Sequence, residues 1–279
     1  MTFRNYSIIL MPILSSFVIF MIWFGLGQNM VQERVEKDGY TVEEAEGARK
    51  AVLPYPNEIL TALTIHRTDL LQATSNTFST AILGFLAAVI GGYGISLLFS
   101  SSLLLKQATY PWILVLQMTP VIILSPILVI WLGPGQRATA LITFLIGFFP
   151  VVANSTQGLI STNKDLLDLF TISNASKWQE IALLRVPNSM PYFLTGMKIA
   201  GTLAPVGAIA GDIFAGTSAS GSAGLGFMIM VYISSAQVPA LFATAILACT
   251  LGFVFVCGVN VIHWLALKNW HDSYGEAEQ

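Results

Sequence analysis

The sequence predicts an all-α integral membrane protein with six transmembrane helices. Of its 279 residues, 54% are hydrophobic and only 10% are charged, whereas a soluble domain carries about 25% charged residues. The mean hydropathy is +0.71. Apolar stretches long enough to cross a bilayer recur along the whole chain. They are Ser7 to Gly27, Leu70 to Ser100, Tyr110 to Leu132, Ala138 to Ile160, Met190 to Ala215 and Val238 to Leu267.

Composition and motifs exclude several classes of protein. The net charge is −2, and no basic block is present that could bind nucleic acid. Cys249 and Cys257 lie in one apolar stretch and are interpreted as small core residues, and the three histidines show no metal-site spacing. No Walker sequence is present. The chain is therefore not expected to be an enzyme, to hydrolyse nucleotide, or to bind a metal or cofactor of its own.

The basic residues predict the orientation in the membrane. The first stretch follows Arg4 and lacks a small-residue cleavage site before Gln28, so it is expected to remain as a helix. Six spans place both termini on one side, and an excess of basic residues marks the cytoplasmic side. We therefore expect a multi-pass protein with both termini in the cytoplasm. The later outer loops hold only Arg137, whereas the inner loops hold Lys106, Lys164, Lys177, Arg185 and Lys268.

Three regions are expected along the chain. Residues 1–69 would form the first transmembrane helix and an external segment, residues 70–270 the transmembrane domain, and residues 271–279 a cytoplasmic tail. In the external segment, "VEEAEGARKAV" predicts a short surface helix, and the Pro54-Tyr55-Pro56 sequence an extended turn. A second helix is expected to follow, capped by Asn57. This segment is interpreted as a solvated lid.

Small residues and prolines predict a packed and kinked bundle. Small side chains four residues apart let helix backbones approach closely in lipid. Prolines within spans free a carbonyl, which a bundle tolerates where protein or a water-filled cavity satisfies it. Polar residues near the prolines, such as Thr119 and Asn154, either line a pathway or join helices by hydrogen bonds. The small residues are Gly84, Ala88, Gly92, Gly196, Ala200, Ala204 and Ala208, and the prolines are Pro120, Pro126, Pro150 and Pro205.

Two ionisable residues lie in the fifth span. A charge inside the membrane is a candidate functional group by default. Lys198 lies near the cytoplasmic end and could instead reach the inner interface. Asp212 lies near the outer end and has either a structural role or a role in gating or substrate contact. An alternative function, an ion-coupled secondary transporter, would depend on these two residues.

The loop between the fourth and fifth spans, residues 161–189, predicts two short helices on the cytoplasmic side. Asn174 suits the left-handed conformation that ends the first helix. Ser176 and Gln179 form a capping box that begins the second. Trp178 and Ile181 are expected on one exposed stripe with Ala182 and Arg185, and Pro187 and Pro191 are expected to turn the chain into the fifth span. A helix lying on lipid is the alternative, but the acidic residues Asp165, Asp168 and Glu180 favour a protein partner.

The segment "ISNASKWQEIALLRVPNSMPYFLTGMKIAG" resembles the cytoplasmic EAA loop of permease subunits of binding-protein-dependent ABC importers. The resemblance is to the branch that serves nitrate, sulfonate, taurine and thiamine-precursor systems. The Gly-Ala-Ser position of the family pattern reads Asn174-Ala175-Ser176, Trp178 is in place, and Pro187 occupies the proline position. The Glu-Ala-Ala position reads Asp168-Leu169-Phe170, which departs from the pattern.

The resemblance implies a type I ABC importer permease (MetI-like) bundle in the bacterial inner membrane. It implies two cytoplasmic ABC ATPase subunits that bind ATP and magnesium, a second permease copy in a homodimer or heterodimer, and an external solute-binding protein. The substrate would be a small solute such as a sulfonate, nitrate, or a pyrimidine or vitamin precursor. A coupling helix from Ala175 to Arg185 would move with the ATPase. The residues implied in coupling are Asp168, Asn174, Ala175, Ser176, Trp178, Glu180, Ile181, Arg185 and Pro187, and those expected in the translocation pathway or gate are Thr119, Pro120, Asn154, Lys198 and Asp212.

Overall fold

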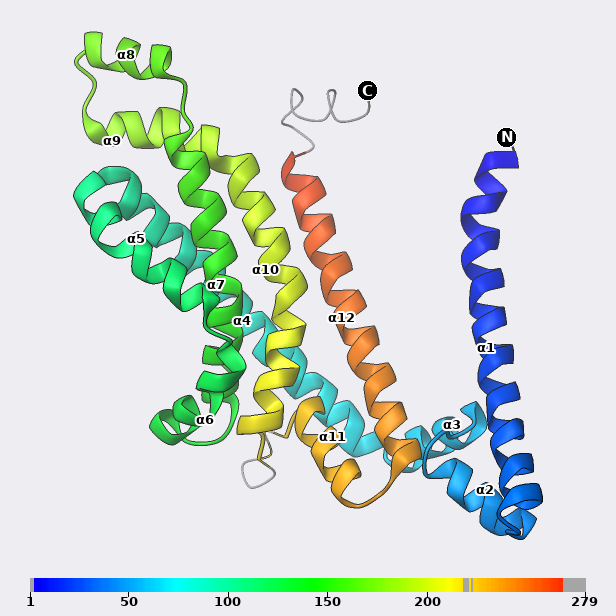
Figure 1. Ribbon diagram of the computed structural model, residues 1–279. Helices are drawn as coiled ribbons and strands as arrows, with labels where there is room; N and C mark the ends of the chain where they lie inside the picture. Colours follow the sequence, from blue (N-terminus) through cyan, green and yellow to red (C-terminus); the bar gives the residue numbers. More distant parts are fainter. Residues whose placement is uncertain (1–2, 218–220, 222, 268–279) are drawn as a thin grey trace. The chain divides into compact units, whose positions relative to one another are not determined.

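The computed structural model describes residues 3–217, 221 and 223–267, and every regular element in these residues is helical (Figure 1). The chain divides into two compact units. The first holds Met1–Thr68 with Val231–Ala245, and the second holds Asp69–Met230 with Ile246–Gln279. The expected cytoplasmic tail at 271–279 lies outside the described residues, as do Lys268 and His271.

The first unit contains α1 (Phe3–Lys37), α2 (Val42–Lys50) and α3 (Pro56–Ile65). The expected surface helix is confirmed as α2, which begins at a capping box between Thr41 and Glu44. The expected cap at Asn57 is wrong, because α3 begins two residues earlier, with Tyr55 at its N-cap. Pro56 fits the first helical position, where its missing N–H needs no partner.

A buried arginine joins α2 to α3. Arg49 is only 1% exposed, and its guanidinium lies 3.6 Å from the centre of the Tyr55 ring. It donates to both carboxylate oxygens of Glu58, at 2.9 and 3.1 Å, and to the Leu53 carbonyl at 2.9 Å. Because the Tyr55 N–H donates to the same carboxylate at 2.7 Å, one ion pair fixes the angle between the two helices.

The helices that are long and apolar enough to cross a membrane include α4 (Arg67–Ser101), α7 (Gln136–Ile160), α10 (Val186–Ala215) and α12 (Val238–Leu267). Among the described residues these four meet the length and hydropathy of a span, with α10 extended back to Lys177 by a continuous helical run. They coincide with four of the expected spans, and the first expected span lies within α1.

The third expected span is not one straight helix. It is divided between α5 (Leu103–Met118) and α6 (Val121–Leu132), which meet at an angle of 101°. Pro120 explains the break, because it has no N–H to continue the helix and it holds the preceding Thr119 in an extended conformation, with φ −76° and ψ 124°. The pair counts as a fifth span if it is taken as one broken helix.

In the second unit, α7 packs against both α4 and α10. A side chain at Gly84 of α4 would meet Thr143 of α7 at 2.5 Å. A Cβ atom at Gly147 of α7 would lie 3.1 Å from Ala88 and 3.5 Å from Ala200, which belong to α4 and α10. The predicted small-residue seams are therefore real contact surfaces, and both converge on α7.

The interpretation of the two cysteines as core residues is wrong. Cys249 and Cys257 are both exposed on α12. Their spacing of eight residues places them near each other on one face of an α-helix. A uniformly apolar helix gives no periodic signal that separates its packed side from its lipid side.

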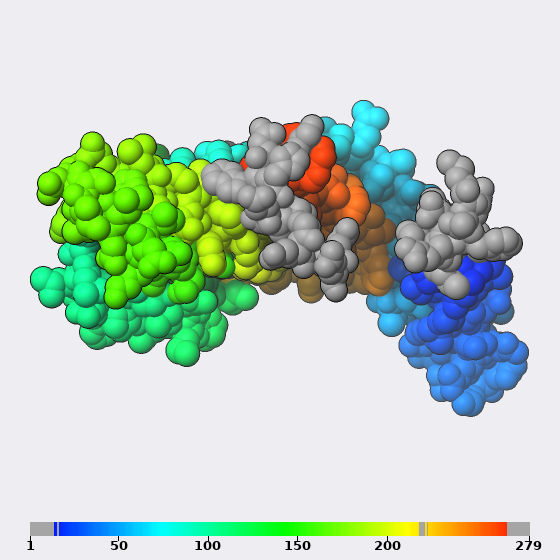
Figure 2. All heavy atoms as spheres, turned by 90° about the horizontal axis from the view of Figure 1, so that it is seen from above, coloured from blue at the N-terminus to red at the C-terminus, as the bar shows by residue number. Residues whose placement is uncertain are grey.

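The two ends of the second unit differ. α8 (Lys164–Ile172), α9 (Lys177–Glu180) and the last turns of α12 lie at one end, whereas α6 and the start of α11 (Leu225–Ser234) lie at the other (Figure 1). A π-helical turn, η1 (Ile181–Arg185), joins α9 to α10. Seen from the first end, the atoms of α8 and α9 lie at the surface of the molecule (Figure 2).

Candidate functional site

The turn between α8 and α9 has the geometry that the sequence predicts. Asn174 adopts the left-handed conformation, with φ 51°. Its N–H donates to the Thr171 carbonyl at 3.1 Å, and the Ala175 N–H donates to the Phe170 carbonyl at 3.0 Å. This pair of hydrogen bonds is a Schellman motif. The prediction that Asn174 ends the first helix is confirmed.

The capping box of α9 is also confirmed. The Ser176 hydroxyl accepts the Gln179 N–H at 3.3 Å, and the Gln179 side chain accepts the Ser176 N–H at 2.8 Å. The chain does change direction between α9 and α10 (Figure 1), but it does so within one continuous helical run from Lys177 to Ala215 and not at a break in the helix at Pro187. Pro187 lies in the first turn of α10, where a proline is tolerated, and the irregularity is instead the π turn before it.

The expected stripe of Trp178 and Ile181 is wrong. Trp178 is 80% exposed, but Ile181 is only 9% exposed and packs inward. Up to Ile181 the helix is regular, because the Ile181 N–H donates to the Lys177 carbonyl, so the side of α9 that carries Ile181 is covered by the chain while the side that carries Trp178 is not. The π turn follows, with the Val186 N–H donating to the Ile181 carbonyl five residues earlier, and it changes the helical period for Ala182 and Arg185. The exposed apolar side chains at this end define what we name the coupling surface. They are Leu166, Leu169, Ile172, Trp178 and Leu183, with Asp168 exposed among them.

Two polar side chains, one at the end of η1 and one at the start of α10, join this part of the chain to α7. Glu180 and Arg185 form an ion pair at 2.6 Å, and Arg185 also donates to the Leu159 carbonyl at 3.4 Å. Asn188 donates to the Gly158 carbonyl at 3.2 Å. Glu180 and Arg185 are thus committed to contacts within the chain, and the exposed part of the coupling surface is mainly apolar.

At the other end of the second unit, Asp212 is 3% exposed and surrounded by hydrogen-bond donors. The Thr77 hydroxyl donates to its carboxylate at 2.6 Å and accepts the Leu225 N–H at 2.8 Å. Thr139 and the Gly226 N–H also face the carboxylate. Asp212 therefore lies at the N-terminus of α11, where a negative group is favoured by the helix dipole.

Gly224 and Gly226, at the start of α11, let the backbone of this helix approach the Asp212 side chain closely. A Cβ atom at Gly226 would lie 2.8 Å from the Cβ of Asp212, and one at Gly224 would overlap its carboxylate. Asn76 adds two hydrogen bonds, to the carbonyls of Gly221 at 2.9 Å and of Ala223 at 2.8 Å. Sequence reasoning missed Thr77, although the polar run "TSNTFST" within an apolar span was a visible signal.

The other expected pathway residues are not brought together with Asp212. Lys198 is exposed, and the fourteen residues between it and Asp212 correspond to about 21 Å along α10. Asn154 donates to the Pro150 carbonyl at 2.8 Å and lies beside Gly196, at the seam between α7 and α10. Thr119 and Pro120 form the corner between α5 and α6.

Comparison with known proteins identifies this arrangement. The family described as "Binding-protein-dependent transport system inner membrane component" matches residues 80–265, which include α7, the coupling surface, α10 and Asp212. The chain belongs to this family. It is a transport permease of the inner membrane with an all-α bundle.

Similar permeases come from several bacteria. A probable ABC transporter permease protein of Haemophilus influenzae is 30% identical, over 77% of this chain and 84% of its own. The formylaminopyrimidine transport permease protein ThiX of Halalkalibacterium halodurans is 33% identical, over 77% of this chain and 85% of its own. The riboflavin transport system permease protein RibX of Chloroflexus aurantiacus is 30% identical, over 61% of this chain and 62% of its own.

These similarities bear on the two functions that the sequence leaves open. Membership in a binding-protein-dependent transport family supports the permease of an ABC importer. The alternative, an ion-coupled secondary transporter that uses Asp212 and Lys198, receives no support from the relatives, and the two residues lie far apart on α10.

Proposed function

We propose that this permease imports a small solute and forms the translocation pathway of an importer whose energy comes from a separate pair of ATPase subunits. The transported solute is a pyrimidine or vitamin precursor, a class supported by the names of the relatives at 30–33% identity. Nitrate and sulfonates remain the other candidate solutes, because more distant relatives carry those names. ATP and magnesium bind to the partner subunits, and an external solute-binding protein delivers the solute.

The coupling surface carries this proposal. Helices α8 and α9 leave large apolar side chains exposed, including Trp178 at 80% and Ile172 at 80%. Exposed tryptophan in the centre of an apolar patch is typical of a hot spot for protein binding. The partner that we assign to this patch is the ATPase subunit. The bulky Leu169 and Phe170 at the Glu-Ala-Ala position imply a matching wider groove on that partner.

The same proposal sets the orientation. If the coupling surface contacts a cytoplasmic ATPase, the end of α12 beside it is also cytoplasmic, as the basic residues predict. The Asp212 cluster then lies on the outer side. We assign Asp212 a structural role at the outer mouth, because three donors of the bundle itself, the Thr77 and Thr139 hydroxyls and the Gly226 N–H, are directed at its carboxylate.

A comparison of two tryptophans tests the coupling surface. Trp178→Ala removes the exposed ring from α9, and we expect the affinity for the ATPase to fall about thirtyfold, the loss of one hot-spot side chain of about 2 kcal/mol. Trp131→Ala is the matched control, since Trp131 is 76% exposed on α6 at the opposite end. The measurement is co-purification and binding of the ATPase to each detergent-solubilised variant.

The outcome distinguishes docking from folding. Both variants should melt close to the wild-type temperature, since neither ring is buried in the chain. If Trp178→Ala retains stoichiometric ATPase with unchanged affinity, the coupling surface is not the docking site. If both variants lose the ATPase equally, the effect is not specific to α9.

A further inference from the structure

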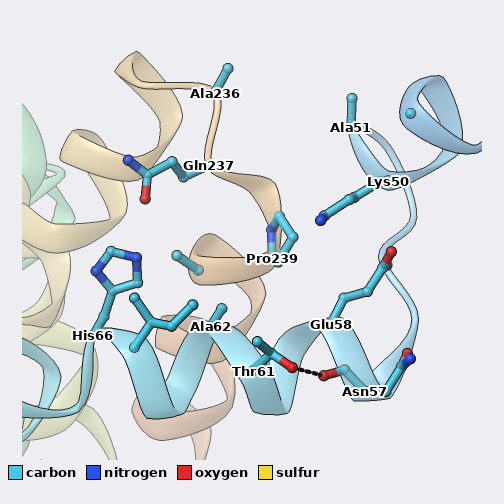
Figure 3. Close-up of a pocket in the computed structure, with 13 residues that line it drawn as sticks. Lys50, Ala51, Asn57, Glu58, Thr61, Ala62, His66, Ala236, Gln237 and Pro239 are labelled. Carbon is cyan, nitrogen blue, oxygen red and sulfur yellow. Dashed lines mark hydrogen bonds between the residues drawn. The ribbon is translucent and has the colours of Figure 1, made fainter. Parts of the chain in front are cut away.

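The first unit contains a hollow of about 500 Å³ between α2, α3 and the segment that joins α11 to α12 (Figure 3). Its floor is apolar and includes Ala62, Ile65 and Pro239. Its polar side chains lie at two ends, with Lys50 at one end and His66 and Gln237 at the other (Figure 3). A volume of this size, with a few polar groups around an apolar floor, is typical of a site for a small molecule.

The wall formed by α2 and α3 is fixed before any ligand binds. Glu58 borders the hollow, but both of its oxygens are occupied, by Arg49 at 2.9 and 3.1 Å and by the Tyr55 N–H at 2.7 Å. The ion pair is thus a support for the wall and is not available to a ligand. A site that is already in shape loses little conformational entropy on binding.

The opposite wall contains a strained residue. Ala236 has a φ of 54°, in the left-handed region that alanine rarely adopts. Its N–H donates to the Ile233 carbonyl at 3.2 Å, and the Gln237 N–H donates to the Tyr232 carbonyl at 2.9 Å, as in a Schellman motif that usually has glycine at this position. Strained backbone of this kind gathers at binding sites, where it holds a neighbouring side chain in place. The side chain held here is Gln237.

The polar groups that remain available include one ammonium group and two side-chain amides, those of Asn57 and Gln237. Within the described part of the chain, the Lys50 ammonium and the Gln237 side-chain amide have no hydrogen-bond partner, and neither forms an ion pair. Lys50 offers three N–H donors and a positive charge, and the Gln237 amide offers two more donors beside the His66 ring. Because Glu58 is neutralised by Arg49, the free charge of the hollow is that of Lys50.

We propose that this hollow is an external binding site for a small anion with an apolar body, such as an aromatic carboxylate, sulfonate or phosphate. Lys50 pairs with the anionic group, the apolar floor covers the body, and Gln237 and His66 donate to acceptor atoms at its far end. The placement on the outer side rests on the orientation proposed above. The chemistry of the site does not depend on the ATPase.

The test measures binding to the purified permease alone, in nanodiscs of phosphatidylcholine, with 4-fluorobenzenesulfonate observed by fluorine NMR. We expect saturable binding, weakened about tenfold in Lys50→Gln and within about twofold of wild type in Lys50→Arg, which keeps the charge. Lys37→Gln is the matched control, because Lys37 is also an exposed lysine of the first unit but lies outside the hollow. Neutral 4-fluorobenzamide should bind at least tenfold more weakly than the sulfonate.

Two further experiments determine whether the bound anion is a lipid headgroup or a free solute, and on which side of the membrane the hollow lies. Nanodiscs that contain phosphatidylglycerol show whether an anionic lipid headgroup competes with 4-fluorobenzenesulfonate for the site. If the lipid competes in the wild type but not in Lys50→Gln, the anion site is filled by lipid. If the lipid does not compete, the site binds a free solute. Lys50→Cys, with the two native cysteines replaced by serine, should react with an impermeant maleimide added outside intact cells. No saturable sulfonate binding, or equal binding by Lys50→Gln and wild type, overturns the proposal. Labelling only from the inside overturns the orientation while leaving the anion site standing.

Discussion

Thr77 is the bridge between Asp212 and α11, and its replacement by valine is the sharpest test of the outer cluster. Valine has nearly the same shape as threonine but has no hydroxyl group. The substitution removes the bond to the Asp212 carboxylate at 2.6 Å and leaves the buried Leu225 N–H without its acceptor at 2.8 Å. Packing is otherwise conserved, so the effect isolates two hydrogen bonds.

The expected cost follows from these two losses. A buried hydrogen bond to a carboxyl group contributes about 1.5–3 kcal/mol, and an unsatisfied buried N–H costs about 1–3 kcal/mol. Together they predict a loss of about 3–5 kcal/mol in the free energy of unfolding, or a fall in melting temperature on the order of 10 °C. Thr77→Ser keeps the hydroxyl and should cost only about 1 kcal/mol for the missing methyl group.

The assay is thermal unfolding of the purified permease in detergent, for Thr77→Val, Thr77→Ser, Asp212→Ala and the double variant. Because Thr77 and Asp212 touch, the double variant should be more stable than the sum of the single effects implies, by about 1 kcal/mol or more. Melting of Thr77→Val within about 2 °C of wild type would refute the bridge. An equal loss in Thr77→Ser would mean that packing, and not hydrogen bonding, holds α11.

Two other predictions, for Glu58 and for Asn174, can be tested by limited proteolysis and by hydrogen exchange. Burial alone would raise the pKa of Glu58, but the hydrogen bonds from Arg49 and Tyr55 and the charges of Arg49 and Lys50 lower this pKa below the ordinary 4.5. The ion pair between Glu58 and Arg49 therefore stabilises the external segment above pH 4.5. This stabilisation is lost as the pH falls through the lowered pKa of Glu58. Limited proteolysis of residues 38–66 should become faster with acid in the wild type and depend little on pH in Glu58→Gln, and parallel profiles would contradict this. At Asn174, with φ 51°, glycine should be tolerated, whereas valine should destabilise the α8–α9 turn by about 1–2 kcal/mol, seen as faster hydrogen exchange at the Ala175 amide; equal exchange in the two variants would show that the left-handed turn is not required.

Much of the fold could be predicted from local signals. Asn174, Ser176 and Gln179 specify a helix end and a helix start through contacts within a few residues, and these predictions are confirmed. The small-residue seams were also visible, because the spacing of four survives in any straight helix.

The failures share one physical cause, which is that they depend on contacts distant in sequence. The prediction of one stripe at Trp178 and Ile181 failed because Ile181 is covered by the rest of the chain, and nothing local in "KWQEIALLR" marks which side of the helix is covered. The role of Thr77 depends on a partner 135 residues away. The exposed cysteines failed because α12 is apolar on all sides, so its packed face is set by its neighbours.

The contact at Gly147 has a mechanical consequence. Since the missing side chain lets α7 touch Ala88 and Ala200 directly, α4, α7 and α10 cannot slide along one another without a clash. At one end, Arg185 and Asn188 attach the start of α10 to the last carbonyls of α7. We therefore expect a displacement of α8 or α9 to move α7 and α10 together, as one rigid block that rotates about the contact at Gly147.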